Sequence, residues 1–391
     1  MGVVRRAVAI VLSAGLTAAC TSQASRTPSN AIVTAEPSAS PVPSAVAPTA
    51  APSPSPRPWV SLIDPGWDGA AWSPDGQWLL VWRQTPNGSP GDEDLLIDRP
   101  DGSTVQRFHG AGANGDGGFD PVWLDGTRFL VAEDGCMVMG TVGSGSLVPF
   151  APIAGLGLTS NGHGAVAWVD TTFSVSAQAA RYVVSTSSGS TPSRPGIPQG
   201  WSHDSTRLVV WHWSSGEGME TLGWLEVLSW PGLHTIAAFP DELAFSSAPQ
   251  ALFDLTDRYL LGEDGRLHDL VTGTKTGVLW PGDQVVDAAW NQSDQVVGAD
   301  LASGQAIAYD VMGHEAFETG PIGDDISGSR DGSAIALWFG DTGGTTLTIL
   351  SGTQQRQIEA PGAVQDEVLL SPDGSRIVIG SSDQPLLLRQ P

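Results

Sequence analysis

A short turn motif that recurs along the chain constrains the fold more than any other feature. Residues 72–82 read WSPDGQWLLVW, so a tryptophan enters a Ser-Pro-Asp-Gly turn and four large apolar residues leave it. Proline fixes φ and glycine adopts the positive φ that tight reversals need, so the motif predicts two antiparallel strands joined by a turn. Nearly the same sequence, SPDGSRIVIG, occurs at residues 371–380.

The spacing of this motif predicts a repeat architecture. Counterparts of the turn at Asp75-Gly76 occur at Asp125-Gly126, Asn161-Gly162, Asp204-Ser205, Thr256-Asp257, Ser293-Asp294, Asp331-Gly332 and Asp373-Gly374. From 75 to 373 is 298 residues over seven intervals, a mean of about 43, and a four-stranded propeller blade takes roughly 40–45 residues. We therefore predict an all-β chain that forms a single β-propeller of four-stranded antiparallel blades. Eight blades are expected; the alternative is seven, with the weak third motif spurious.

Tryptophans recur at fixed offsets from these turns. Three residues before the turn stand Trp72, Trp201 and Trp290, and seven residues after it stand Trp82, Trp211 and Trp338. A ligand cage needs one aromatic cluster, whereas packing between blades needs an aromatic in many repeats, so we assign these side chains to inter-blade packing. The predicted structural set is Trp72, Asp75, Gly76, Trp82, Trp201, Trp211, Trp290, Asp331, Trp338 and Asp373.

The two ends of the repeat region predict how the ring closes. The last repeat has room for three strands, at residues 367–370, 376–379 and 386–388. Residues 59–64, WVSLID, form a further strand with no place in the first repeat. We expect this amino-terminal strand to join the last blade, because closure removes exposed sheet edges.

With these motifs in view, the chain resembles a known family. The SPDG turn followed by an apolar strand, at Ser73 and at Ser371, resembles the WD-repeat-like propellers of bacterial envelope proteins, such as the TolB periplasmic protein and the propellers of prolyl oligopeptidases. The resemblance covers about residues 59–391 and implies the fold, while one fold serves many activities. The peptidases carry a hydrolase domain after the propeller; this chain ends at Pro391, so the resemblance does not imply that activity.

The amino terminus predicts export and lipid attachment. Arg5 and Arg6 precede an apolar run at residues 7–16, as in a secretory signal peptide. The following LTAAC ends at Cys20 and resembles the lipobox of bacterial lipoproteins, whose cysteine is diacylated; that family usually has Leu where this chain has Thr17. The alternative is an ordinary signal peptide with an incidental cysteine. The resemblance implies a bacterial envelope protein anchored to the outer face of the cytoplasmic membrane.

Composition separates a tether from the folded domain. Residues 20–58 are rich in Ser, Ala and Pro with scarcely any charge, so they cannot bury a core and are expected to form an extended tether. The predicted organisation is a signal peptide at 1–19, the lipidated cysteine and tether at 20–58, and the propeller at 59–391. The chain has 42 acidic and 18 basic residues, which disfavours nucleic-acid binding.

No constellation of residues in the sequence predicts catalysis, a metal site or a cofactor. The seven histidines are scattered, and no Gly-x-Ser-x-Gly elbow or phosphate loop occurs. We interpret the histidines as exposed loop residues; the alternative is that His212 faces the same surface as Glu217. Acid-rich stretches at residues 92–94 and 114–120 offer oxygen ligands for calcium but match no calcium motif, so we favour no metal. Once Cys20 is lipidated, Cys136 is predicted to be a buried, unpaired thiol without an intrachain disulfide.

Long connections predict where a partner binds. The Asp-Gly turns must share one face of the ring, and the longer, more variable connections lie on the opposite face. The candidate binding residues in those connections are Asp92, Glu93, Asp116, Asp120, Trp213, Glu217 and Glu220. We expect a monomeric binding, scaffold or sensor module for an unidentified protein or envelope polymer. The alternative is a propeller enzyme of the lyase, glycoside hydrolase or dehydrogenase type, which would need acids or histidines that converge near the ring axis.

Overall fold

The computed structural model describes residues 59–63, 67–84, 93–109, 120–133, 136–152, 158–170, 180–215, 222–243, 253–262, 265–279, 288–300, 305–321, 325–341, 344–352, 354–360, 367–380 and 386–389. Every element of regular structure in these residues is a β-strand, as the turn-rich sequence predicts. Within these ranges there is no helix of the length and apolarity needed to cross a bilayer.

The strands form antiparallel sheets in chain order. The first sheet contains β2 (Trp67–Trp72), β3 (Leu79–Gln84), β4 (Glu93–Asp98) and β5 (Thr104–His109), and the second contains β6 (Val122–Trp123), β7 (Arg128–Glu133), β8 (Cys136–Thr141) and β9 (Leu147–Pro152). The third contains β10 (Thr159–Ser160), β11 (Ala165–Val169), β12 (Arg181–Thr186), β13 (Gly189–Ser190) and β14 (Arg194–Pro195). The fourth contains β15 (Ile197–Trp201), β16 (Arg207–Ser215), β17 (Leu222–Ser229) and β18 (Thr235–Leu243).

The remaining four sheets continue the series and return to the amino terminus. The fifth sheet contains β19 (Tyr259–Leu261) and β20 (Leu267–Asp269), and the sixth contains β21 (Ala288–Trp290), β22 (Val296–Asp300), β23 (Gln305–Tyr309) and β24 (Glu315–Pro321). The seventh contains β25 (Asp325–Gly328), β26 (Ile335–Asp341), β27 (Gly344–Ser351) and β28 (Gln354–Ala360). The last contains β29 (Glu367–Leu370), β30 (Ile377–Gly380) and β31 (Leu386–Arg389) together with β1 (Val60–Ile63).

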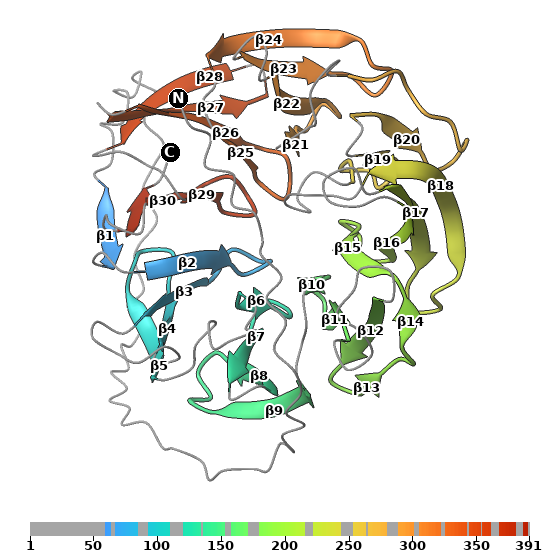
Figure 1. The fold of residues 1–391 in the computed structure, drawn as a ribbon. Helices are drawn as coiled ribbons and strands as arrows, with labels where there is room; N and C mark the ends of the chain where they lie inside the picture. Colours follow the sequence, from blue (N-terminus) through green and yellow to red (C-terminus); the bar gives the residue numbers. More distant parts are fainter. Residues whose placement is uncertain are drawn as a thin grey trace, which may run out of the picture.

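These sheets are the blades of a β-propeller. The first strands of successive sheets surround the axis, and the fourth strands lie at the periphery (Figure 1). Within the described residues, seven sheets have four or five strands and are complete blades, and the sheet of β19 and β20 has two. Two isolated bridges, Phe253 with Leu260 and His268 with Lys275, add a pairing on each side of that short sheet.

The blade count refines the prediction at two repeats. The third repeat, suspected to be spurious, is a full sheet, so that part of the seven-blade alternative is wrong. Its strands β11 and β12 have the sequences AVAWV and RYVVST, and most of their residues are buried. The short sheet instead arises from the fifth repeat, at the turn Thr256-Asp257. The described residues thus form a seven-bladed propeller, the number of the alternative, and the expected eighth blade is the two-stranded sheet.

The predicted closure of the ring is confirmed. Strand β1 pairs antiparallel with β31 through Val60 with Leu388 and Ser61 with Leu387, so it is the outer strand of the last blade (Figure 1). Because β1 precedes the first blade in the chain, this pairing joins the two ends of the propeller. The interface between the last blade and the first blade is called the closing seam below.

The core consists of apolar layers between neighbouring blades. Along β3, Leu80 and Trp82 face Phe129 of the second blade, whereas Leu79 and Val81 face the last blade. This alternation is what a strand buried on both faces requires, since successive side chains point to opposite sides. Aromatic edges add to the packing; the ring centroids of Phe108 and Phe129 lie 5.7 Å apart across the two blades.

Two ends of the ring are distinguished below. The turn face carries the turns between the first and second strands of each sheet, which are the eight turns of the repeat. The loop face is the opposite end, where second strands end and third strands begin. Glycine occupies the left-handed position of the turn at Gly76 and Gly374, with φ of 67° and 63°. Ser205, Asp257 and Asp294 adopt the same conformation where the motif lacks glycine.

Candidate functional site

The turns of the repeat are built by the aspartate that the sequence analysis assigned to them. In the first blade, the Ser73 hydroxyl donates to Asp75 Oδ1 at 2.7 Å, and the Gln77 backbone N–H donates to the same oxygen at 3.1 Å. The Gly76 N–H closes the turn on the Ser73 carbonyl at 2.8 Å. The same serine–aspartate pair closes the turns at Asp204, Asp331 and Asp373. The carboxylates are therefore used locally, as caps.

The capping hydrogen bonds favour the ionised form of Asp204 and Asp373. Burial alone would raise the pKa of Asp204, but hydrogen bonds from Ser202 and Thr206 outweigh burial and hold the pKa below its usual value. The same balance lowers the pKa of Asp373. An acid that must remain charged to hold its turn is poorly suited to proton transfer at neutral pH.

Neighbouring turns are bonded to one another around the turn face. The Ser205 hydroxyl donates to the Asn161 carbonyl of the preceding blade at 2.7 Å. The Ser333 hydroxyl donates to the Asp373 carbonyl at 2.9 Å, and the Gln292 N–H donates to the Gly332 carbonyl at 3.1 Å. These bonds join adjacent repeats at their turns, so the turn face is a connected layer.

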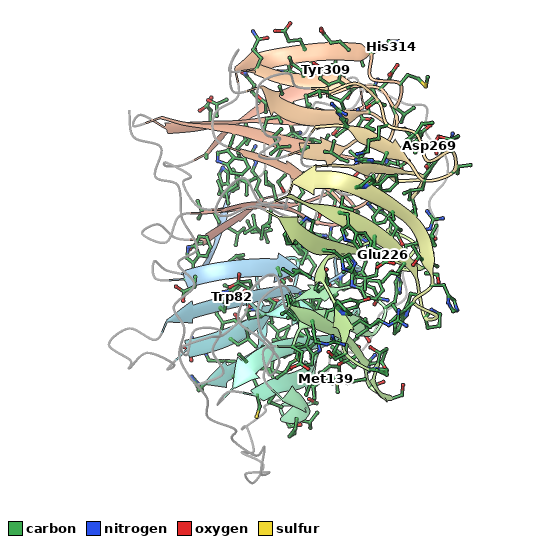
Figure 2. The ribbon with its side chains drawn as sticks, turned by 45° about the vertical axis from the view of Figure 1, so that its right-hand side comes forward. Trp82, Met139, Glu226, Asp269, Tyr309 and His314 are labelled. Carbon is green, nitrogen blue, oxygen red and sulfur yellow. The ribbon has the colours of Figure 1, made fainter. Side chains whose placement is uncertain are left out.

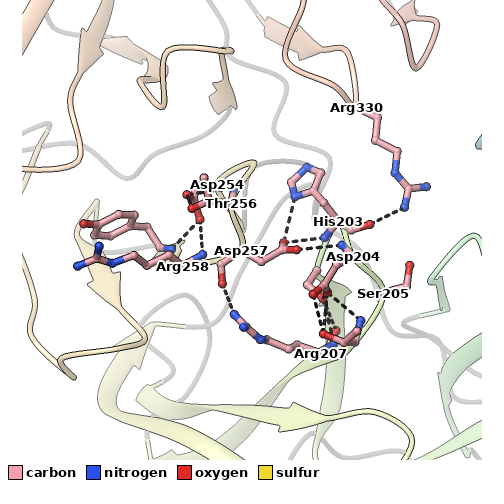
Figure 3. A network of polar contacts seen from close by, with 12 residues as sticks. His203, Asp204, Ser205, Arg207, Asp254, Thr256, Asp257, Arg258 and Arg330 are labelled. Carbon is pink, nitrogen blue, oxygen red and sulfur yellow. Dashed lines mark hydrogen bonds and ion pairs between the residues drawn. The ribbon is translucent and has the colours of Figure 1, made fainter.

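The densest polar network on this face links the fourth and fifth repeats (Figure 3). The carboxylate of Asp257, which is buried, accepts the backbone N–H groups of His203 and Asp204 at 2.7 and 2.9 Å. His203 Nδ1 lies 3.3 Å from the same carboxylate. The Arg207 guanidinium donates to the Asp257 carbonyl. The Asp257 carboxylate thus holds the turn of the fourth repeat through the backbone N–H groups of that turn.

Arg330 extends this network across the ring. Its Nη2 donates to the His203 carbonyl at 3.3 Å, although the two residues belong to blades far apart in the chain (Figure 3). A Cβ atom at Gly162 would lie 2.8 Å from Arg330 Nη1 and 3.0 Å from Pro74 Cγ. Burial lowers the pKa of Arg330, and the nearby Asp257 opposes that shift. The Arg330 guanidinium therefore contacts the turn at His203 and lies beside the turn at Gly162, which itself lies beside Pro74 of the first blade.

The loop face holds a histidine–carboxylate pair that the sequence analysis did not predict. At the end of β5, His109 Nδ1 lies 2.6 Å from Asp94 Oδ1, and Arg107 Nη2 lies 3.4 Å from Asp94 Oδ2. Asp94 is buried, whereas the His109 side chain is largely exposed. Asp94 belongs to the acid-rich stretch considered for calcium, and these two partners already occupy both of its oxygens.

A second pair lies on the fourth blade (Figure 2). His212 Nε2 lies 2.9 Å from Glu226 Oε2, and the Thr235 hydroxyl donates to Glu226 Oε1 at 2.5 Å. The His212 ring stacks on Trp224 with centroids 3.8 Å apart. Burial lowers the pKa of His212, and the bond to Glu226 partly opposes this. Glu217, the alternative considered for His212, lies outside the described residues; the carboxylate partner of His212 in the structure is Glu226.

Acidic residues gather at strand ends on the loop face. The Asp and Glu residues at or next to these ends are Asp68, Glu93, Asp94, Asp120, Glu133, Asp170, Asp241, Glu242, Asp300, Asp325, Asp341 and Glu367. The chain segments that connect the loop-face ends carry further acids at Asp64, Asp92, Asp116, Asp134, Glu217, Glu220, Glu263, Asp264, Asp283, Asp287, Asp324, Asp366 and Asp383, and a single basic residue, Arg266. The turn-face connections contain Arg99, Arg258, Arg330 and Arg376. The two faces therefore differ in charge.

The predicted binding residues are only partly covered by the described residues. Asp120 is exposed and directly precedes β6, the innermost strand of the second blade. Glu93 begins β4 and Trp213 lies in β16, both near the loop face. Asp92, Asp116, Glu217, Glu220 and the predicted lipidation site Cys20 lie outside the described residues. Their assignment to a binding surface therefore stays a prediction.

The tryptophans of the repeat lie between blades. Trp201 Nε1 donates to the Thr159 carbonyl of the preceding blade at 3.1 Å. Trp123, which falls one place out of register and was left out of the predicted set, makes the equivalent bond to the Ala71 carbonyl at 2.8 Å. Trp82, Trp211, Trp290 and Trp338 are buried, with 3–5% of their surface exposed. In these positions the indoles fasten each blade to its neighbour and leave no open cage.

Cys136 is the first residue of β8, is half-buried and is disulfide-bonded in this structure. The unpaired thiol was predicted for the chain lipidated at Cys20 and stays a prediction for that form. The expectation assumed that lipidation removes Cys20, the other cysteine of the chain, from pairing. Elsewhere in the described ranges, no group of three or more His, Cys, Asp or Glu side chains is arranged to hold a metal ion.

Comparison with known proteins supports the fold and leaves function to the chain itself. No protein-family model matches the sequence, and no curated protein matches it. Among solved structures, one described as the crystal structure of the eukaryotic initiation factor is similar with a TM-score of 0.51 and 13% identity, over 84% of this chain and 89% of that chain. A chain of the mitotic checkpoint complex has a TM-score of 0.47 and 13% identity, over 90% and 96%. At this identity, the first likeness shows a shared propeller fold.

Proposed function

We propose that this protein is a non-catalytic binding module whose loop face holds a cationic surface of a protein partner. The observation that carries the proposal is the difference between the two faces. On the turn face, the aspartates cap turns, Arg207 and Arg330 bond to backbone carbonyls and Arg258 pairs with Asp269, so the charges serve the fold. The connections of the loop face carry many acids and one basic residue, Arg266. Such a surface raises the association rate of a positively charged partner and makes binding dependent on salt.

The rigidity of the frame supports the same role. The turns are bonded to each other, and β1 closes the ring, so the loop-face connections start and end at strands whose positions are fixed by the blades. A rigid scaffold that presents variable connections is a common basis for recognition. The first structural neighbour comes from a protein named for translation initiation, which is compatible with a scaffold role for the fold and says nothing of this chain's partner.

We further propose that the propeller is held at a membrane. The support is the sequence alone: the arginine pair and apolar run at residues 5–16, the lipobox-like end at Cys20 and the uncharged segment at 20–58. A lipid on Cys20 would place the propeller on the outer face of a bacterial cytoplasmic membrane. The tether would then let the loop face reach partners in the envelope.

Site-specific photo-crosslinking in intact cells tests the binding role. A photoreactive residue is placed at Asp92, Asp116 or Asp120 on the loop face, and at Glu318 on the outer strand β24 as the control. We expect one partner to be captured from the loop-face positions and not from Glu318. Capture only at Glu318, or no adduct at any position, would argue against a loop-face partner.

Charge neutralisation then tests the role of the acids. The variant Asp92→Asn, Glu93→Gln, Asp120→Asn removes three charges from the loop face. The matched control, Glu315→Gln, Glu318→Gln, Glu359→Gln, removes three from outer strands. Measured at low salt against the captured partner, the loop-face variant should bind at least about tenfold more weakly, because steering and pairing of charges both weaken. Equal affinities for both variants would leave the acids without a role.

A further inference from the structure

The last residue of β4, Asp98, is a buried acid without a basic partner among the groups that act on it. Its exposed fraction is 0%, neither carboxylate oxygen has a hydrogen bond of full geometry in the described part of the chain, and the Thr104 hydroxyl is the one donor near enough to act on it. It pairs in register with Leu79 of β3 and with Thr104 of β5. Buried carboxyl groups are normally paired, because an unpaired charge loses its hydration without compensation. This acid therefore needs an explanation.

Asp98 faces the closing seam. Directly opposite residues on neighbouring strands point to the same side of a sheet, so Asp98 shares the side of Leu79. Leu79 and Leu96 belong to the apolar cluster that joins the first blade to Val378 and Leu388 of the last blade. Val378 and Leu388 cannot pair with a carboxylate, and no basic residue of the last blade is among the groups that act on Asp98.

The turn that follows Asp98 touches the ring-closing strand. A Cβ atom at Gly102, near the tip of this turn, would lie 2.8 Å from Leu62 Cδ2 and 3.3 Å from Val60 Cγ1 of β1. Leu62 also joins the apolar cluster of the seam. The buried acid thus stands at the base of the turn against which β1 packs.

We propose that protonation of Asp98 controls how firmly β1 closes the ring. With a neutral carboxyl group, the seam is apolar and closed. With an ionised carboxylate, release of β1 and of the adjoining turn lets water reach the charge. The proposal concerns the propeller itself and does not depend on the proposed binding role. If residues 20–58 are a tether, its pull acts directly on this strand.

The neighbourhood of Asp98 favours the proton. Burial raises the pKa of Asp98 to about 6 from an ordinary value of 3.8; the Thr104 hydroxyl opposes the shift, and the negative charge of Asp101 adds to it. Arg99 is exposed in the same turn and is not among the groups that act on Asp98. The closed seam therefore retains its proton at a pH where a solvated aspartate has lost it.

The sign of the pH dependence follows from this difference. Below pH 3.8, Asp98 is protonated whether the seam is closed or open, so its contribution is constant. Between pH 3.8 and about 6, the open seam loses the proton first, and closure weakens as pH rises. Above about pH 6 both states are ionised and the effect is complete. The shift corresponds to a change of about a hundredfold in the equilibrium between open and closed seams.

Hydrogen exchange of the full-length protein tests the proposal. Exchange is measured between pH 4 and pH 7.5 and converted to protection factors, which remove the intrinsic pH dependence of exchange. We expect protection of the β1 and β31 amides to fall by up to about a hundredfold with rising pH. Amides of β17, in the fourth blade, should change much less, because that sheet is remote from the seam.

Two variants decide whether Asp98 is responsible. Asp98→Asn should give β1 high protection at every pH, whereas Asp101→Asn, which removes an exposed acid from the same turn, should keep most of the pH response. Retention of the full response in Asp98→Asn would overturn the proposal. An equal response of β1 and β17 in the wild-type protein would overturn it too, since the transition would then be global; this readout needs no variant.

Discussion

At the residue scale, the turn aspartates and tryptophans have structural tasks that explain why so many of them recur. Asp75 caps its turn, and Trp201 bonds to the neighbouring blade. Such roles were accessible from the sequence because they repeat at fixed offsets. The sequence did not predict the pair of His109 with Asp94 or the contact of Arg330 with His203, because each occurs once and joins different strands or blades. Spacing along the chain carries no information on such contacts.

The close packing of Trp82 yields a prediction about a single glycine. A Cβ atom at Gly69 would lie 2.7 Å from Trp82 Cε2, and both residues sit in the core of the first blade. Gly69→Ala must displace the indole, and overpacking of this kind costs about 1–3 kcal/mol. Urea unfolding should therefore show a lower midpoint for Gly69→Ala. Gly277→Ala is the matched control, because nothing lies within 4 Å of its added Cβ; similar midpoints for the two variants would contradict the packing argument.

At the element scale, the closing strand shows what the sequence could predict. Residues 59–64 were assigned to the last blade because that repeat lacked a strand, and β1 spans Val60–Ile63 in that place. The third and fifth repeats show the limit. The third repeat has a glycine-rich turn that matches the motif poorly, yet its strands β11 and β12 are strongly apolar. The fifth has a good turn, yet β19 and β20 are three residues each.

Strand β1 should contribute to stability through its inward side. Leu62 packs into the closing seam, whereas Val60 is 43% exposed. Leu62→Ala removes partly buried apolar surface and should lower the free energy of unfolding by about 1–2 kcal/mol, at the lower end of the range for core leucines. Val60→Ala should cost less than about 0.5 kcal/mol. Chemical denaturation of both variants measures the difference.

Removal of the whole strand is the stronger test. Deletion of residues 59–64 leaves Leu387 and Leu388 on an unpaired edge and should lower the melting temperature by many degrees. A deletion of six residues within 21–58 serves as the length control and should leave the melting temperature unchanged. If both deletions melt at the wild-type temperature, β1 does not close the ring in solution.

At the scale of the whole molecule, a lipid anchor and an intrachain disulfide exclude each other, because both would use the sulfur of Cys20. The chain has two cysteines, and Cys136 is disulfide-bonded in the structure. A lipid on Cys20 occupies its sulfur, so the anchored form cannot also bond Cys20 to Cys136. The two states of the protein are therefore distinguished by the state of one thiol. The loop-face acids and the apolar cluster of the closing seam include neither cysteine.

Mass spectrometry that counts free thiols and detects the lipid tests the anchor at Cys20. Protein from the membrane fraction is alkylated under denaturing conditions without reductant. We expect a mature chain that begins at a diacylated Cys20 and carries one alkyl group, on Cys136. Cys20→Ser should release the protein from the membrane and keep Cys136 alkylatable. A membrane-fraction chain without lipid, in which Cys136 resists alkylation until a reductant is added, would show that the disulfide prevails and that the lipid anchor is wrong.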